Sequence, residues 1–235
     1  DFDMRLIDLF KEMDKKKLTL KMQIRQEYYR VKELLDGKRP SRMDLFTYMD
    51  DDIYRCCVSG SHAKENPFQH YLDFLYELDE LSEDEQKLYA GIGREFIQTI
   101  ETTEMQKVYK MPILYSFYNH GNIRLAVTDE EVLESWKEFF DTGTNWKDFP
   151  NVNTYEDYKK VTDKQHLSKA KRMPIRFLKA SGKGFFVEKD GYALALRDEI
   201  GDVVGNMAFG EQMGDVLGYR SLEYYRRRYE RREGD

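Results

Sequence analysis

Apolar residues recur at helical spacing over most of the chain. Large apolar side chains return every three or four positions within 18–35, 42–49 and 68–81, and this period predicts amphipathic helices. A longer helix is expected over 82–104 and a short buried one over 111–118. Further helices are expected over 4–10, 128–142 and 164–178, the last of these interrupted by Pro174, and two more close the chain, the final one over about 219–232.

Helix start signals support several of these boundaries. Ser41 is placed to cap the helix that follows it. Ser82 with Glu85, and Thr128 with Glu131, have the spacing of capping boxes, in which the first side chain and the residue three positions later satisfy each other's backbone N–H groups. These signals indicate where three helices begin.

One segment breaks the helical pattern. Residues 184–187 and 192–196 are rich in aromatic and aliphatic side chains, and they flank a turn that ends in Asp190-Gly191, a strong signal for a tight β-turn. The expected fold is therefore mainly α, with two packed helical subdomains. We expect the first over 1–110 and the second over 111–235, with a small β-hairpin at about 184–196.

Composition narrows the class of protein. Of 235 residues, 40% are hydrophobic and 35% are charged, which is enough apolar content for a packed core. Cys56 and Cys57 are adjacent, and because a vicinal disulfide is strained, two reduced thiols and a cytoplasmic location are expected. Residues 1–4 do not have the pattern of a signal peptide, so we expect none here, and no run of about 18 apolar residues predicts a membrane span. Because the sequence begins with Asp1, we expect a segment of a longer protein.

Charge is distributed unevenly along the chain. The net charge is −6, yet residues 71–88 alone carry a net −6 and residues 158–183 carry a net +8. The acidic stretch is typical of a solvated junction between helices, or of a surface that faces a basic partner. The basic stretch is the electrostatic feature most relevant to binding.

Each sequence string that resembles a catalytic motif has a simpler structural explanation. Residues 125–130 resemble a strand followed by an acidic pair, but the capping box explains the same residues. Residues 181–184 resemble part of a phosphate-binding loop but lack its earlier glycine and the Ser or Thr after the lysine. Glu188-Lys189 is similar to the Glu-x-Lys end of some metal-dependent nucleases, but the hairpin turn explains these residues. No histidine has the spacing of a zinc ligand. We expect no catalytic residue, metal or cofactor, and an independent enzyme is the least favoured of three hypotheses.

Two segments mix cations with aromatic or aliphatic residues, as nucleic-acid-binding surfaces do. In the first, the alternative is that Ile175, Phe177, Leu178 and the hairpin aromatics belong to the core and the lysines are simply solvated. The second is the final helix, which could also be a docking helix. The candidate phosphate contacts are Lys171, Arg172, Arg176, Lys179, Lys183, Arg227 and Arg231.

Several strings together resemble one protein family. They are 37–46 (GKRPSRMDLF), 110–114 (KMPIL), 117–123 (FYNHGNI), 173–178 (MPIRFL) and 224–229 (YYRRRY). They are similar to the region after the motor of large bacterial superfamily II helicases of the DEAD/DEAH-box, restriction-enzyme-like type. The resemblance implies a parent protein that hydrolyses ATP and translocates on DNA with an upstream motor, and no catalytic residue carries over to this chain.

Two roles follow for such a region. It contacts or guides DNA as a non-catalytic accessory region, or it docks onto the motor or another protein without touching nucleic acid. The first requires the basic side chains to gather on one exposed face, and the second requires an exposed apolar or tyrosine-rich patch.

Overall fold

The computed structural model describes residues 18–233 of the main chain and the side chains of residues 18–230. The described residues are mainly helical and contain one small antiparallel sheet, which confirms the predicted fold class. The chain forms two compact units, residues 1–80 and residues 81–235. The helix expected over 4–10 lies outside the described residues.

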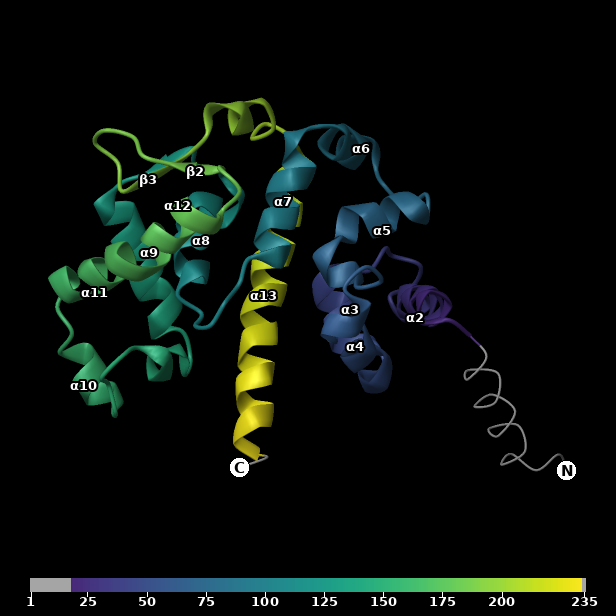
Figure 1. Cartoon of the computed structure of the whole chain (residues 1–235), viewed down its shortest axis with the longest axis horizontal. Helices are drawn as coiled ribbons and strands as arrows, with labels where there is room; N and C mark the ends of the chain where they lie inside the picture. The colour runs from purple at the N-terminus through teal and green to yellow at the C-terminus, as the bar shows by residue number, and fades with distance from the viewer. Residues whose placement is uncertain (1–17, 234–235) are drawn as a thin grey trace, which may run out of the picture. The chain divides into compact units, whose positions relative to one another are not determined.

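Helices joined by turns make up the described part of the first unit, residues 18–80. They are α2 (Leu20–Leu34), α3 (Arg42–Tyr48), α4 (Asp51–Val58) and α5 (Tyr71–Glu77), with 3-10 turns at Gly60–His62 and Pro67–Gln69 (Figure 1). The first two were predicted, and α3 begins at a capping box of Ser41 and Asp44. The expected helix over 68–81 is shorter, because His70 leaves the helical conformation. The apolar pattern did not predict α4.

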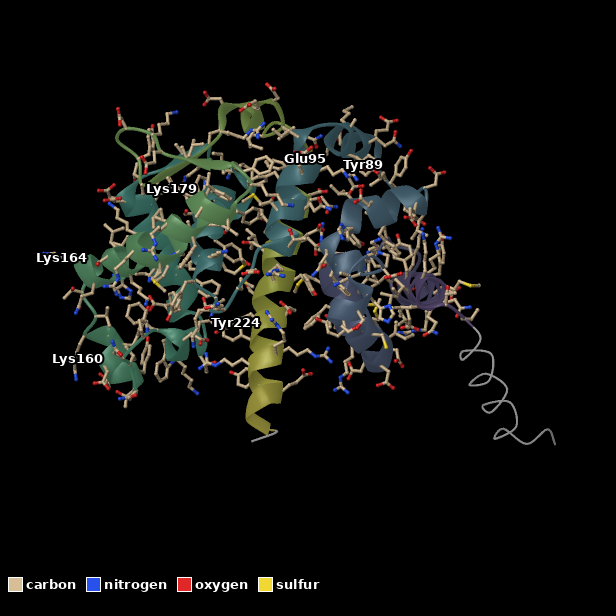
Figure 2. The ribbon with its side chains drawn as sticks, in the orientation of Figure 1. Tyr89, Glu95, Lys160, Lys164, Lys179 and Tyr224 are labelled. Atoms are coloured by element: carbon tan, nitrogen blue, oxygen red, sulfur yellow. The ribbon has the colours of Figure 1, made fainter. Side chains whose placement is uncertain are left out.

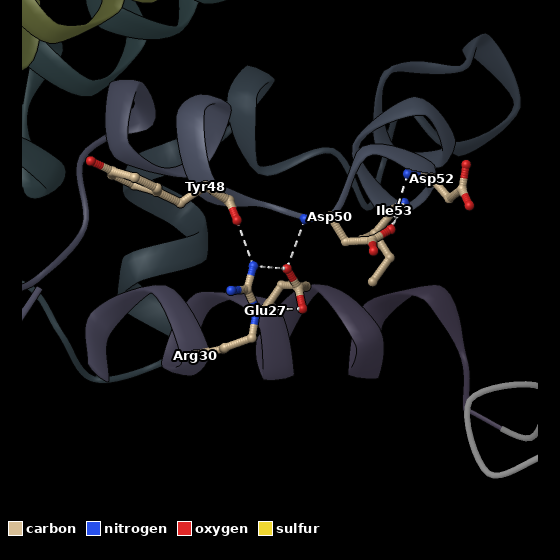
Figure 3. A network of polar contacts seen from close by, with 6 residues as sticks. All are labelled: Glu27, Arg30, Tyr48, Asp50, Asp52 and Ile53. Atoms are coloured by element: carbon tan, nitrogen blue, oxygen red, sulfur yellow. Dashed lines mark hydrogen bonds and ion pairs between the residues drawn. The ribbon is translucent and has the colours of Figure 1, made fainter. Parts of the chain in front are cut away.

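Polar contacts join α2 to the α3–α4 corner of the first unit (Figure 3). The Arg30 guanidinium pairs with Glu27 on the same helix at 2.7 Å and donates to the carbonyl oxygen of Tyr48. Glu27 also accepts the backbone N–H of Asp50 at 2.8 Å. The Asp50 side chain in turn caps α4 by accepting N–H groups of its first turn. One carboxylate and one guanidinium thus satisfy backbone groups at the end of α3 and the start of α4.

The second unit contains the larger set of elements. They are α6 (Glu83–Ala90), α7 (Ile92–Thr102), α8 (Lys110–Tyr118), β1 (Ala126–Val127), α9 (Asp129–Asp141), α10 (Tyr155–Lys159), α11 (Asp163–Ala170), α12 (Arg176–Ser181), β2 (Phe186–Val187), β3 (Leu194–Leu196) and α13 (Met207–Glu233). The capping boxes at Ser82 and Thr128 are both present. The helix predicted over 82–104 divides at Gly91 into α6 and α7.

The predicted hairpin forms part of a three-stranded sheet in the order β1-β3-β2. β2 and β3 pair antiparallel, with Phe186 opposite Leu196. β1 adds to the other edge of β3, where Ala193 donates its N–H to Val127 at 2.8 Å. The sequence pattern did not predict β1, because two residues are too few to show the alternation of a strand.

The chain ends in one helix of 27 residues, α13, where two helices were predicted. It lies beside α7 (Figure 1). Gly214 explains how α13 passes close to the end of α8, since a Cβ there would lie 2.6 Å from the Tyr118 hydroxyl oxygen. The glycine therefore permits close helix packing and does not end the helix. Neither α13 nor any other helix among the described residues has the length and apolar character needed to cross a membrane.

The boundary between the units falls between Glu80 and Leu81, not near residue 110 as predicted. The physical reason is that α6 and α7 pack against α13. Gln212 on α13 donates to the buried Glu85 carboxylate at 2.7 Å, and Arg220 donates to the Glu101 carbonyl at 2.9 Å. These contacts join positions more than 100 residues apart, which no local sequence pattern reveals.

Candidate nucleic-acid interface

A continuous helical segment over residues 163–181 carries most of the predicted contact residues. It begins at a capping box in which Thr162 and Gln165 satisfy each other's backbone N–H groups. Pro174 lies in its middle, inside a π-helical turn over Lys171–Ile175 that connects α11 to α12. Proline has no N–H, and its ring crowds the carbonyl of the preceding turn. The wider π turn accommodates it, so the predicted interruption changes the helix pitch without ending the helix.

One side of this segment is buried and the other faces outward. Ala170, Ile175 and Leu178 are buried, and the segment packs on α8 and α9. Arg172 and Arg176 are exposed. The alternative that the apolar residues of this stretch belong to the core is therefore right for Ile175 and Leu178.

Three of the predicted phosphate contacts already hold a carboxylate. Lys171 pairs with Asp129 at 2.6 Å, Lys179 pairs with Glu188 in the hairpin turn, and Arg227 pairs with Glu223 at 2.6 Å. These are surface pairs of small net stability, since solvent screens them. They reduce the positive charge that each cation presents, so these three are weaker candidates than the sequence suggested.

The other predicted contacts differ in their surroundings. Arg172, Arg176 and Lys183 are exposed, and within the described residues none of them has an ion pair. Lys183 lies in the turn after α12 with a positive φ of 50°. The side chain of Arg231 lies outside the described residues, so its predicted role stays a prediction.

The arginines of the final helix are mostly engaged in structural contacts. Arg226 pairs with Glu230 at 3.0 Å, and Arg228 pairs with the fully buried carboxylate of Asp148. Tyr224 donates to the same carboxylate at 3.1 Å. Together with the Arg227–Glu223 pair, these contacts make α13 a less positive surface than its sequence indicates.

A groove of about 610 Å³ lies beside α11. Its lining contains four cations and one carboxylate, together with apolar side chains that include Phe149 and Val152. The cations are Lys160, Lys164, Lys169 and Arg172, and the carboxylate is Asp157. Figure 2 shows Lys160 and Lys164 projecting from the corner where α10 leads into α11. The groove therefore concentrates positive charge in a chain whose net charge is −6.

Lys160, Lys164 and Lys169 belong to the basic stretch over residues 158–183, but they were not among the predicted phosphate contacts. The missed signal is the spacing of 164, 168 and 172 by four residues, which places them on one helix face. All three positions line the groove. The apolar lining from Phe149 and Val152 could not be anticipated, because those residues lie in an irregular loop.

Electrostatics inside the groove favour an anion. Burial and then the nearby Arg172 lower the pKa of Lys169 from its usual range. Lys160 is held by Asp157 at 3.4 Å, while Lys164 has no ion pair within the described residues. An anion bound between these cations would relieve their mutual repulsion, which is the arrangement expected of a phosphate contact.

The aromatic residues near this helix divide into two groups. Phe185 and Phe186, which were candidates for stacking, are buried and belong to the core. Phe177 is 42% exposed and Tyr192 is 44% exposed. The alternative that these aromatic residues belong to the core is therefore right for Phe185 and Phe186 and wrong for Phe177 and Tyr192.

Buried His166 ties the groove-bearing helix to the core. Its ring packs against Phe149 with 4.9 Å between ring centres and against Tyr158 with 5.6 Å. Burial, followed by the charge of Lys137, lowers the pKa of His166 from its usual range. The neutral imidazole is thus the form that the folded chain accommodates.

We expect the second unit to lose stability as pH falls below about 6.5, the ordinary pKa of histidine. The unfolded chain protonates His166 first, so the free energy of unfolding decreases until the lowered native pKa is passed. Urea unfolding at about pH 7.5 and 5.5 measures this loss. His166→Gln should make it smaller, and His120→Gln, which changes an exposed histidine, controls for the removal of one imidazole. An equal loss in wild type and His166→Gln would contradict the expectation.

The described residues contain no group of three or more potential metal-binding side chains. Residues 181–184 comprise the last residue of α12 and the turn that leads to β2, and the Ser181 hydroxyl donates to the Phe177 carbonyl at 2.7 Å. Lys110 is buried, and its ammonium group donates to the Thr103 hydroxyl at 3.0 Å.

A second hollow of about 410 Å³ lies within the first unit. Its lining mixes both signs of charge, since it contains Lys21 and Lys64 together with the carboxylates of Glu65, Asp73 and Glu77. Lys21 is paired with Glu77 at 2.7 Å. Because its charges largely cancel, this hollow is a weaker anion site than the groove.

No protein-family model matches the chain, and neither does any curated protein or solved structure.

Proposed function

We propose that the second unit binds the phosphate backbone of nucleic acid through the groove and the adjoining outward face of α12. The observation that supports this most directly is the charge of the groove, whose lining has four cations and a single carboxylate. Phosphate contacts supply most of the sequence-independent affinity of proteins for nucleic acids.

The distribution of charge favours an extended polyanion over a compact anion. Beyond the groove, Arg176 and then Lys183 continue the exposed cations toward the sheet, and neither has an ion pair within the described residues. A small anion would be held by the groove alone. A chain of phosphates can contact the groove and the further cations together.

The setting of this binding is also part of the proposal. The strings that resemble the C-terminal region of bacterial superfamily II helicases support a non-catalytic accessory role, with an ATP-driven motor in the parent protein. Free Cys56 and Cys57 suit a cytoplasmic location, where thiols stay reduced.

Charge reversal tests the proposal. In the variant Lys164→Glu/Arg172→Glu/Arg176→Glu, we expect the affinity for fluorescein-labelled DNA to fall below detection by fluorescence anisotropy at about 50 mM salt. The corresponding triple alanine variant should bind weakly, and its slope of log affinity against log salt should shrink by about 0.9 for each lost phosphate contact with duplex DNA.

A matched control lies in the first unit, where Lys38→Glu/Arg55→Glu/Lys64→Glu reverses three exposed cations. This variant should retain most of the wild-type affinity. Equal losses in both triple variants would indicate a non-specific charge effect. Absence of binding by the wild-type chain would contradict the proposal and favour the docking role, which the exposed Leu34 and Tyr76 side chains of the first unit support.

A further inference from the structure

The second unit presents three aromatic rings to solvent between residues 155 and 192. Tyr155 is 41% exposed, Phe177 is 42% exposed and Tyr192 is 44% exposed. They lie on α10, on α12 and in the hairpin. Figure 1 shows α10, α11 and α12 following one another, with β2 and β3 beyond α12. The three rings therefore lie in or next to the stretch of the chain that carries the groove residues and the adjoining cations.

Each of these rings has a cation beside it. The Lys159 ammonium lies 4.8 Å from the centre of the Tyr155 ring, and the Arg176 guanidinium carbon lies 5.1 Å from that of Phe177. The Lys189 ammonium lies 5.5 Å from the centre of the Tyr192 ring. A ring that is exposed to solvent and has a cation close to it can stack on a base while the cation meets a nearby phosphate. The Tyr155 ring also contacts the rings of Trp146 and Tyr158, with 5.7 Å and 6.0 Å between ring centres, so a base can cover only its remaining exposed surface.

The other large aromatic side chains in this part of the unit are packed. Phe149, Tyr158, Phe185 and Phe186 are all buried. The exposure of the three rings is thus not a general looseness of the segment. Aromatic rings bury large apolar areas when they can, so a ring that stays outside the core leaves a surface that an apolar, planar ligand can cover.

Stacking distinguishes the two forms of nucleic acid. In a duplex the bases stack on one another, and the outer surface offers phosphates to a protein. In a single strand the base faces are accessible to aromatic side chains. Cations alone would accept either form, whereas cations interleaved with exposed rings match the unpaired strand.

We infer that the nucleic acid bound by this surface is single-stranded, with its phosphates on the groove and outward cations and its bases stacked on Tyr155, Phe177 and Tyr192. This inference rests on the proposed function and specifies its ligand. It concerns the second unit alone.

The test compares a labelled oligodeoxythymidine of about 20 nucleotides with a duplex of the same length, titrated with the full chain. We expect the single strand to bind more tightly. Tyr155→Ala/Phe177→Ala/Tyr192→Ala should weaken single-strand binding about 100-fold, on the order of fivefold for each ring, and change duplex binding by no more than about twofold. The salt slope for the single strand should stay unchanged, because no phosphate contact is removed.

Two variants keep the result interpretable. Tyr29→Ala/Tyr48→Ala/Tyr76→Ala removes three exposed rings of the first unit and should retain wild-type affinity for the single strand. If the second-unit triple variant fails to fold by thermal melting, the single substitution Phe177→Ala replaces it, with an expected loss of about fivefold.

The outcomes separate this inference from the proposed function. Equal affinity for duplex and single strand, or full single-strand affinity in the ring variants, would overturn the single-strand inference. The proposed function would still stand if charge reversal abolished binding. No binding of either DNA would overturn both.

Discussion

We expect Asp148→Ala to lower the free energy of unfolding of the second unit by about 3 kcal/mol or more. The Asp148 side chain is fully buried, pairs with Arg228 and accepts a hydrogen bond from Tyr224 at 3.1 Å. Its removal leaves a mostly buried guanidinium without this carboxylate and a buried hydroxyl without this acceptor. Both are groups whose desolvation is costly when it is not compensated.

Urea denaturation followed by circular dichroism measures this loss. Asp148→Asn is the informative companion, because an amide oxygen can still accept from Tyr224 but carries no charge. It should lose less stability than Asp148→Ala. Glu188→Ala, which removes the exposed partner of Lys179, is the matched surface control and should cost much less stability than Asp148→Ala, because solvent screens this pair. A loss as small for Asp148→Ala as for this control would mean that the buried pair contributes little.

Asp148 also shows why the final helix resists interpretation from sequence. From the sequence alone, the tyrosines and arginines of α13 indicate a docking or phosphate-binding surface. In the structure, Arg228 and Tyr224 meet a carboxylate that lies 76 or more positions earlier in the chain. A cation whose partner is distant in sequence looks unpaired until the fold is known. The same applies to Lys171, whose partner Asp129 is 42 positions away.

Local signals in the sequence were sufficient where the physics is local. The capping boxes at Ser82 and Thr128 and the turn at Asp190-Gly191 depend on residues within a few positions of one another, and all of them form. The length of α13 was not predictable in this way. Gly214 weakens a helix in isolation, and only the approach of Tyr118 reveals that the glycine serves close packing.

The candidate interface was partly predictable for a related reason. Helical spacing can place Lys164 and Arg172 on one face, but it does not show that the loop from Phe149 to Val152 completes a groove beside them. The sequence pattern was equally unable to predict which aromatic side chains are exposed. Phe177 and Phe186 have the same side chain and lie nine positions apart, yet one is exposed and the other is packed in the core.

The second large effect is expected for Phe96→Ala, which should destabilise the second unit by about 3–5 kcal/mol. The Phe96 ring is fully buried, and its centre lies 5.3 Å from that of Phe185, 6.1 Å from that of Phe186 and 5.6 Å from that of Phe209. It therefore joins α7 to the sheet region and to α13. Truncation removes a large apolar area and these ring contacts, and leaves a cavity that rigid neighbours can fill only in part.

This substitution also tests where the chain divides. If Phe96 belongs to the second unit, hydrogen exchange in Phe96→Ala should accelerate in β2, β3 and α13, while protection in α2 and α3 is retained. Ile24→Ala, which truncates a buried side chain of α2, should show the reverse pattern. If Phe96→Ala instead accelerated exchange in α2 and α3 and left α13 protected, the division between Glu80 and Leu81 would be wrong, and a boundary near residue 110 would describe the folding units better. The packing of α6 and α7 on α13 argues for the first outcome, because α13 holds both helices through direct contacts, including the hydrogen bonds to Glu85 and Glu101.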